Sequence, residues 1–491
     1  MSVSLNKKTG KAVAWSSVTE IMAKLVSPIV NMVLARLLTP EAFGAVATIT
    51  MIITFAELFT DAGFQKYIVQ HEFSSEDELD KNTNVAFWTN FVLSAVIVGL
   101  IVLFRDPLAT LVGSPDLGGG IAVSSFIILL VAFSSIQTAR FRRDLNFKPL
   151  FFVRIGSTLI PLVVTVPLAF TLKSYWALVV GNLAVNLFNA VVLTVKSKWK
   201  PKLFYSFGLL REMFAFSVWT LLESILIWLT ANVDIFVVGS VLDNYYLGLY
   251  KTSMTTVNSY MTIITAAVTP VLFSTLSRYQ NDEVNFRSTY LKFQKYVAVL
   301  VIPMSAGIFI FRNFVTDVLL GSQWGEAAEF VGLWGLISGI AIVFATFSSE
   351  VYRSKGNPKL SMLAQALHLI VLIPAVMLAV NSSYEVLYIV RALVRLQFIL
   401  VHIILICSVY KFNFLMSLKN MLPAFISTAA MSVVGIVLEM VSTSILLQII
   451  SVLVCIVVYF AVLLIAFPKT RKEIFEIEVV SKTIAKIKKR P

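Results

Sequence analysis

Long apolar runs separated by short polar connections make up most of this chain. A helix that crosses a membrane needs about 20 mostly apolar residues, and the pattern predicts fourteen such spans. They are 12–38, 41–62, 84–104, 119–140, 149–170, 174–196, 212–240, 245–273, 293–316, 327–350, 358–380, 384–410, 417–440 and 444–467. We therefore predict an all-α, polytopic membrane protein.

Composition favours a membrane protein over a soluble one. Hydrophobic residues make up 58% of the 491 and charged residues 14%, whereas soluble domains average about 45–50% and about 25%. Mean hydropathy is +0.85, and a single soluble core could not bury that much apolar surface. Cys407 and Cys455 lie inside apolar runs, so they predict neither a disulfide framework nor a metal site. No cleavable signal peptide is predicted at the start of the chain.

The net charge of +13 is explained by the position of the basic residues relative to the membrane, and it does not indicate a nucleic-acid partner. Counted with the ends of the adjoining spans, the odd-numbered connections carry only Arg105, Lys173 and Arg312, whereas the even-numbered ones carry twenty Lys and Arg. Basic loops face the cytoplasm in membrane proteins. The even connections, both termini and the basic tail are therefore predicted to be cytoplasmic.

The two halves of the chain show weak self-similarity. An offset of 204 residues aligns Trp15 with Trp219 and Gly44 with Gly248. Six spans would precede the second copy, so both copies would enter the membrane from the same side, and a site is expected between such repeats. The predicted parts are an N-terminal lobe, 1–200, a C-terminal lobe, 201–412, two additional helices, 413–467, and a tail, 468–491.

The tail is basic and has apolar residues on one helical stripe. The stripe consists of Ile474, Ile477, Ser481, Ile484 and Ile487. Two interpretations stay open, a helix on the anionic inner leaflet and a solvated cytoplasmic tail.

Charged residues inside the predicted spans are the candidates for function, because a charge near the bilayer centre costs roughly 2.5–3.5 kcal/mol. Such residues normally face the bundle interior or a wet cavity. The basic candidates, for a cationic substrate-binding cavity, are Lys24, Lys251, Arg391, Arg395, Arg36 and Arg154. The acidic candidates, for ion coupling or a structural role, are Glu20, Glu223, Asp234 and Glu57.

Helical spacing places several polar residues on common faces. The stripes are Glu20, Lys24 and Asn31 in the first span, and Lys251, Thr255 and Asn258 in the eighth. Arg391 and Arg395 lie one turn apart, where like charges repel, so we expect an anion between them or an acidic partner for each. A structural interpretation also stays open, with Glu20–Lys24 as a local pair and Asp234 holding helices together.

No catalytic motif is present in the sequence. There is no Gly-rich phosphate loop followed by Lys and Ser or Thr, and no metal-spaced or nucleophile–base cluster. We expect no enzymatic activity and no cofactor.

Several stretches are similar to one family. They are Leu34–Gly44 (LARLLTPEAFG), Phe59–Phe64 (FTDAGF), Ala231–Gly239 (ANVDIFVVG), Leu247–Tyr250 (LGLY), Pro270–Arg278 (PVLFSTLSR) and Gly321–Trp324 (GSQW). These resemble the lipopolysaccharide and exopolysaccharide flippases of the multidrug/oligosaccharidyl-lipid/polysaccharide superfamily, in particular the branch with the colanic acid exporter.

This resemblance implies two six-helix lobes around a central cavity, two extra helices, and alternating access. The implied substrate is an oligosaccharide on undecaprenyl pyrophosphate, moved to the outer leaflet of the bacterial inner membrane. Related flippases have key basic residues on the first and eighth helices, which Lys24 and Lys251 match. They often have a basic residue where this chain has Ser240. The resemblance also implies coupling to Na⁺ or H⁺, with Glu20, Glu223 and Asp234 as candidates, and a polysaccharide polymerase and other assembly proteins as partners.

Three other functions fit the sequence less well. A cation-coupled drug antiporter of the same superfamily usually has an acidic cavity, whereas basic residues outnumber acidic ones inside these spans. A glycan polymerase or ligase would need a large outer loop, and every odd connection is short. A scaffold protein would not need so many charges within the membrane.

Overall fold

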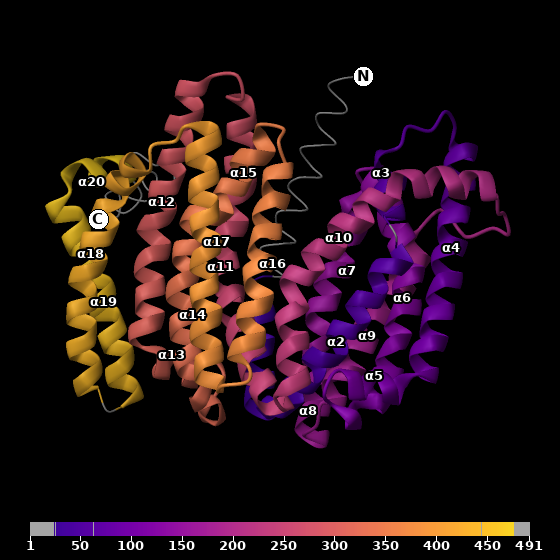
Figure 1. Cartoon of the computed structure of the whole chain (residues 1–491), viewed down its shortest axis with the longest axis horizontal. Helices are drawn as coiled ribbons and strands as arrows, with labels where there is room; N and C mark the ends of the chain where they lie inside the picture. Colours follow the sequence, from indigo (N-terminus) through magenta and orange to yellow (C-terminus); the bar gives the residue numbers. More distant parts are fainter. Residues whose placement is uncertain (1–23, 25, 62, 443, 476–491) are drawn as a thin grey trace, which may run out of the picture. The chain divides into compact units, whose positions relative to one another are not determined.

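The computed structural model describes residues 24, 26–61, 63–442 and 444–475; the side chains of 61, 215–220, 223, 267 and 474 are not described. All regular elements in this part of the chain are helical (Figure 1), which confirms the all-α prediction.

The long helices follow one another through short connections. They are α2 (Pro40–Asp61), α4 (Glu76–Leu103), α6 (Gly118–Arg143), α7–η2–α8 (Phe147–Ile160, Pro161–Thr165, Val166–Leu172), α9 (Trp176–Lys196), α10 (Phe207–Val241), α11 (Asn244–Arg278), α12 (Glu283–Ile310), α14–η4–α15 (Ala328–Ala341, Ile342–Thr346, Phe347–Ser354), α16 (Lys359–Ala379), α17 (Tyr384–Tyr410), α18 (Phe414–Val441) and α19 (Ile445–Ala466). Short helices lie between them: α3 (Phe64–Gln70), α5 (Arg105–Leu111), η1 (Pro115–Leu117), α13 (Arg312–Leu319) and η3 (Ser322–Ala327). A further short helix, α20 (Pro468–Phe475), follows α19.

Twelve helices of the described residues are long and apolar enough to cross a membrane. A thirteenth span is formed if Asn244–Ala266 and Val268–Arg278, which meet at a bend of 42°, are taken together. A shorter apolar helix, Val26–Leu37, lies within the first predicted span. A polytopic membrane protein is thus confirmed, while the total of fourteen spans and the cytoplasmic side of the termini stay predictions.

Some predicted boundaries were wrong because helices continue beyond their apolar runs. The span predicted at 293–316 is α12, which begins ten residues earlier at Glu283 and ends at Ile310. Asp282 caps its first turn by accepting from the backbone N–H of Asn285. In the same way Ser75 caps α4, which begins at Glu76 rather than at 84. A capped polar turn carries no apolar signal, so hydropathy missed both starts.

The helices group into two compact units. The first unit comprises the described residues of Met1–Ser259 together with Leu319–Trp324 and Gln365–Arg391. The second unit comprises Tyr260–Val318, Gly325–Ala364 and the described residues of Ala392–Pro491. The lobe boundaries predicted near residues 200 and 412 are not tested by this grouping and stay a prediction.

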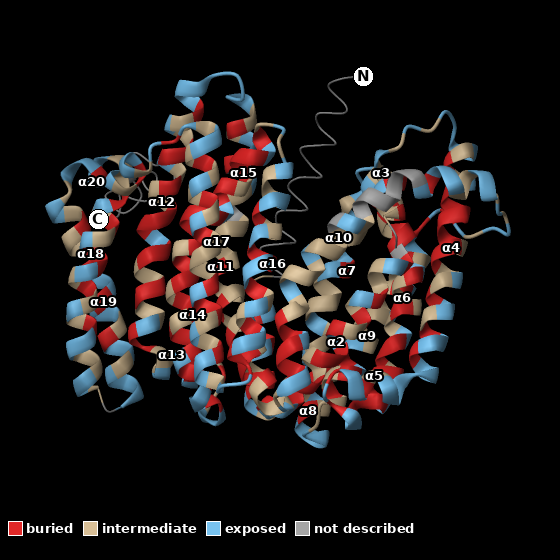
Figure 2. Ribbon diagram, in the orientation of Figure 1, coloured by how far each residue is buried: buried red, intermediate tan, exposed pale blue. Residues whose placement is uncertain are grey.

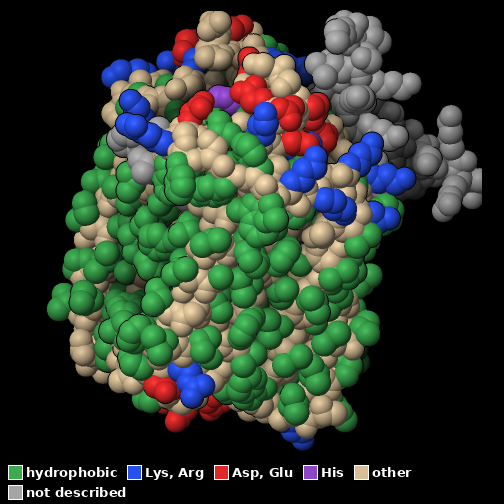
Figure 3. Space-filling model, turned by 90° about the vertical axis from the view of Figure 1, so that its right-hand side faces the viewer, with side chains coloured by type: hydrophobic (Ala, Val, Ile, Leu, Met, Phe, Trp, Pro, Cys, Tyr) green, Lys and Arg blue, Asp and Glu red, His purple; other side chains and the backbone are tan. Residues whose placement is uncertain are grey.

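Helix α4 shows how the first unit suits a bilayer. Val92, Val96 and Leu100 are exposed on one stripe, while Asn90 and Ser94 are buried on another face (Figure 2). Asn90 Nδ2 donates to Ser135 Oγ of α6 at 2.9 Å, and Ser94 Oγ donates to Asn90 Oδ1. Interhelical hydrogen bonds of this kind hold membrane helices together. The molecular face in Figure 3 has a broad hydrophobic band, with most charges gathered at one end.

In the first unit, three basic connections converge at one end. Arg140, at the end of α6, contacts Asp80 of α4 at 2.7 Å, so the predicted fourth and second connections meet. The backbone N–H of Lys202 donates to Asn84 Oδ1 at 2.7 Å, and Trp88 Nε1 donates to the Lys202 carbonyl at 2.8 Å. The sixth connection therefore joins them. This convergence is the arrangement that the charge pattern predicted for one side of the membrane.

The two glycines aligned by the 204-residue offset lie against each other. A Cβ on Gly44 of α2 would lie 1.9 Å from the Asn244 carbonyl oxygen, and a Cβ on Gly248 of α11 would lie 1.9 Å from that of Pro40. Asn244 is itself 204 residues after Pro40. The contact is thus reciprocal, as expected where two copies of a motif meet about an approximate twofold axis.

Candidate functional site

Asp234 of α10 and Arg391 of α17 form a buried ion pair in the first unit. Asp234 Oδ2 lies 2.9 Å from Arg391 Nε, and the two residues are 1% and 6% exposed. The hydroxyl of Tyr250, on α11, donates to the same Oδ2 at 2.9 Å. The backbone N–H of Ile235 donates to Oδ1 at 2.9 Å. Three helices therefore meet on one carboxylate, and these bonds offset the cost of removing two charges from water.

Lys251 adds a second positive charge to this cluster. It follows Tyr250 on α11, is half-buried, and lies close enough to Asp234 and Arg391 to interact electrostatically with both. Because Arg391 already neutralises Asp234, the charge of Lys251 is in excess. The cluster of Asp234, Arg391, Tyr250 and Lys251 therefore carries a formal net charge of +1.

The polar stripe predicted on α11 lies on the less buried face of that helix. Lys251 and Asn258 are half-buried and Thr255 is exposed, whereas Thr252 and Ser253 are buried. Polar and charged side chains of a membrane helix face a wet cavity in preference to lipid. The excess charge of Lys251 thus stands on a face that suits a polar ligand.

Arg395 lies one turn after Arg391 on α17 and has a different environment. Its guanidinium lies 4.1 Å from the ring centroid of Trp334, in the second unit. Arg391 has the acidic partner that was one of the two expected arrangements. No anion between the two arginines is needed to explain the position of Arg391.

Arg154 of α7 lines a hollow of about 360 Å³ in the first unit, where polar and apolar side chains are mixed. Ser27 and Asn31 of the first helix line the same hollow, with Thr158 and Asn182. Lys24 lies on the predicted stripe that contains Asn31 and is half-buried at the start of the described chain. The structure therefore brings Asn31 of this stripe to the same hollow as Arg154, whereas Lys24 is not among the lining residues.

The other candidates are dispersed or not described. Arg36 is exposed, and its side chain packs near Gly321. Glu57 of α2 is half-buried and forms no ion pair with another described residue. Glu20 lies outside the described residues, and the side chain of Glu223 is not described.

Sequence reasoning missed the side chains that position the candidates. Tyr250 stands within the quoted Leu247–Tyr250 motif, which is the signal that could have linked it to Lys251. Gln323 and Trp324, of the quoted Gly321–Trp324 motif, donate to the Ala35 carbonyl at 2.6 and 2.8 Å. They satisfy a carbonyl near the end of the helix Val26–Leu37. The motif thus fixes the first helix.

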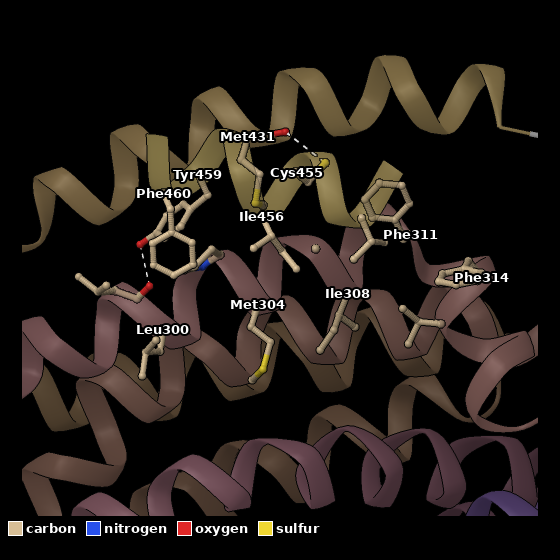
Figure 4. Close-up of a pocket in the computed structure, with 15 residues that line it drawn as sticks. Leu300, Met304, Ile308, Phe311, Phe314, Met431, Cys455, Ile456, Tyr459 and Phe460 are labelled. Carbon is tan, nitrogen blue, oxygen red and sulfur yellow. Dashed lines mark hydrogen bonds between the residues drawn. The ribbon is translucent and has the colours of Figure 1, made fainter. Parts of the chain in front are cut away.

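A separate apolar pocket of about 400 Å³ lies in the second unit, between α12, α18 and α19 (Figure 4). Leu300, Met304 and Ile456 are among its lining residues, and the hydroxyl of Tyr459 donates to the Val299 carbonyl at 2.7 Å. Its chemistry suits hydrocarbon and offers nothing to an anion. Over the described part of the chain, no three His, Cys, Asp or Glu side chains are grouped as metal ligands.

Comparison of the fold with solved structures gives the class of protein. A structure of the lipid II flippase MurJ in an inward closed conformation has a TM-score of 0.74 at 14% identity, covering 93% of this chain and 99% of that one. An inward-facing multidrug transporter of the MATE family, from the MOP superfamily, has a TM-score of 0.61 at 12% identity, covering 85% and 98%. The chain is thus a multi-pass membrane protein with the fold of this superfamily, as the resemblance implied.

The chain belongs to a family described as polysaccharide biosynthesis proteins, whose model matches residues 33–329. It is 26% identical over 350 residues to the succinoglycan biosynthesis transport protein ExoT of Rhizobium meliloti, covering 71% of this chain and 70% of that protein. It is 22% identical over 367 residues to the lipopolysaccharide biosynthesis protein WzxC of Escherichia coli, covering 74% and 70%. These findings confirm the family expected from the sequence and place the protein in a bacterial inner membrane.

Proposed function

We propose that this protein is a flippase for undecaprenyl-pyrophosphate-linked oligosaccharide. It would move repeat units from the cytoplasmic to the outer leaflet for a cell-surface polysaccharide. The observation that carries the proposal is the excess charge of Lys251 beside the neutralised Asp234–Arg391 pair. Transport proteins among its relatives and the fold of a lipid II flippase support it.

The charges suit a pyrophosphate headgroup. Water must be replaced by fixed cations when such a group enters the membrane, and an ammonium acts there as a strong point charge. Lys251 and Lys24 supply charges of this kind on two different helices. The prenyl tail stays in lipid, so only the headgroup and sugars need a polar path. Alternating access moves the substrate without changing it chemically, so no enzymatic step is required.

A drug antiporter fits the charged cluster less well. Cationic drugs would require an available carboxylate, and Asp234 already accepts from Arg391, Tyr250 and the backbone. Glu57 stands apart from this pair, and we propose it, with Glu20 and Glu223, as a candidate for coupling to Na⁺ or H⁺. A polysaccharide polymerase and other assembly proteins are the proposed partners.

Complementation of a null strain tests the proposal. The strain would carry the wild-type chain, Lys24→Ala or Lys251→Ala. Lys81→Ala is the matched control, because Lys81 is an exposed residue near the start of α4. We expect the lipid-linked repeat unit to accumulate in the cytoplasmic leaflet in the null strain and in the first two variants, and wild type and Lys81→Ala to relieve it. Normal translocation in the null strain would contradict the flippase function. Full activity of both Lys24→Ala and Lys251→Ala would contradict a cationic binding site.

A further inference from the structure

A second basic hollow lies in the first unit between α6, α7 and α9, with a volume of about 570 Å³. Its charged lining residues are Arg142 and Arg154, and no acidic residue is among the described residues that line it. Ser134, Thr138, Ser157 and Asn189 add polar groups from all three helices. The hollow therefore combines two fixed positive charges with several hydrogen-bonding side chains.

Neither arginine is neutralised by the described part of the protein. Arg140 is paired with Asp80 and Glu76, and Arg143 donates to the carbonyls of Ile68 and His71. Arg142 is exposed and forms no ion pair or hydrogen bond with the described residues, and the same holds for the guanidinium of Arg154. Arg140 and Arg143 thus stabilise the fold, while Arg142 and Arg154 remain available to a ligand.

The position of the hollow matches the depth of lipid headgroups. Arg142 lies in the last turn of α6, next to the basic fourth connection. Arg154 comes seven residues after Phe147, the first residue of α7, which is about 10 Å along a helix with its rise of about 1.5 Å per residue. A phosphate at the predicted cytoplasmic surface could therefore contact both arginines while its hydrocarbon stays in the bilayer.

Arg154 also connects this hollow to the next one. It lines both the α6–α7–α9 hollow and the hollow that contains Asn31, and Ser157 is shared by the two as well. Ser157 Oγ lies 2.5 Å from Asn189 Oδ1, which links α7 to α9 at this point. Arg154 and Ser157 thus form a polar connection between Arg142 in one hollow and Asn31 in the other.

We propose that the α6–α7–α9 hollow is a phosphate-binding subsite that takes the pyrophosphate of the lipid-linked substrate at the cytoplasmic side. This assignment rests on the proposed flippase function and adds a loading step before the substrate reaches Lys251. Arginine suits the step, because its planar guanidinium binds phosphate oxygens through two parallel hydrogen bonds. The headgroup of an ordinary anionic phospholipid offers the same chemistry, so the two sources must be separated by experiment.

Binding of undecaprenyl pyrophosphate to the full-length protein tests the subsite. The protein would be placed in phosphatidylcholine nanodiscs and titrated with undecaprenyl pyrophosphate or with undecaprenol, which has the same tail and no phosphate. We expect wild type to prefer the pyrophosphate, and Arg142→Gln and Arg154→Gln each to weaken its binding about tenfold, as loss of one charge-assisted contact does. Lys148→Gln is the matched control, because Lys148 is an exposed cation at the same end that does not line the hollow. Unchanged thermal unfolding would show that the variants are folded.

The outcomes separate the alternatives. Wild-type affinity in both arginine variants would overturn the subsite. A second titration in phosphatidylglycerol nanodiscs distinguishes the sources: retained pyrophosphate binding supports the substrate, and complete competition by phosphatidylglycerol assigns the hollow to bulk lipid and overturns the loading step. If the arginine variants bind normally while export still needs the protein, only the subsite fails. If binding depends on the arginines but the null strain translocates normally, the flippase function fails and the phosphate site stands.

Discussion

The charged cluster around Asp234 and the basic hollow around Arg142 and Arg154 both lie in the first unit, yet they differ in how their arginines are partnered. In the cluster, a buried carboxylate accepts from Arg391, Tyr250 and the backbone. In the hollow, two arginines face a polar space, and none of the described residues that line it is acidic. The difference separates charges that hold helices together from charges that can bind a ligand. We propose that Lys251 belongs to the second kind, although it lies beside the Asp234–Arg391 pair.

Asp234→Asn should have the largest effect on stability. It leaves Arg391 buried without its carboxylate, and removing one partner of a buried pair costs about 3–5 kcal/mol. Thermal unfolding of the purified protein in detergent would show a strongly lowered midpoint. The double variant Asp234→Asn/Arg391→Gln should recover part of the loss, because it removes the unpaired charge. A wild-type midpoint for the single variant would contradict a structural role for the pair.

Gly44→Ala should come next. Its Cβ would lie 1.9 Å from the carbonyl oxygen of Asn244, so the start of α2 must move away from the start of α11. Lys251 lies on the same part of α11, three residues after Gly248. Overpacking of this kind costs about 1–3 kcal/mol. Gly99→Ala is the control, because nothing lies within 4 Å of its added Cβ, and it should stabilise α4 by about 0.5–1 kcal/mol. Equal unfolding midpoints for the two variants would remove the close contact from the account.

Part of this architecture could be predicted from the sequence. The apolar runs gave the helical class and the approximate positions of the spans, and the repeat offset pointed to Gly44 and Gly248. The Asp234–Arg391 pair could not be predicted, because the two residues are 157 positions apart on helices whose pairing no periodicity encodes. Arg142 could not be singled out either, because the sequence does not distinguish it from Arg140 and Arg143 in the same basic connection, and both of these have partners in the structure.

Arg395→Gln should have a smaller effect than Asp234→Asn. The guanidinium of Arg395 lies over the ring of Trp334, and such a cation–π contact contributes about 0.5–2 kcal/mol. Arg395→Lys keeps the charge and should fall between wild type and Arg395→Gln in thermal unfolding. If Arg395→Gln lowered the unfolding midpoint as much as Asp234→Asn, the two arginines of α17 would contribute equally to stability.

Lys81→Gln should have the smallest effect. Lys81 pairs with Asp77 at 2.7 Å on an exposed turn of α4, and a surface pair at this spacing contributes about 0.2–0.5 kcal/mol. Neither the unfolding midpoint nor export should change measurably. A clear export defect would mean that an ion-paired surface lysine also contributes to transport. The distinction between paired and unpaired charges would then not hold.

Reconstitution tests the flippase account most directly. Purified protein would be placed in liposomes that carry undecaprenyl-pyrophosphate-linked oligosaccharide, and the fraction of oligosaccharide reachable by an added glycosidase would be followed over time. The account predicts translocation with wild type and with Lys81→Gln, and a rate at the level of protein-free liposomes with Lys251→Ala of unchanged thermal stability. Translocation by Lys251→Ala at the wild-type rate would contradict the central claim that the excess charge beside Asp234 and Arg391 carries the substrate.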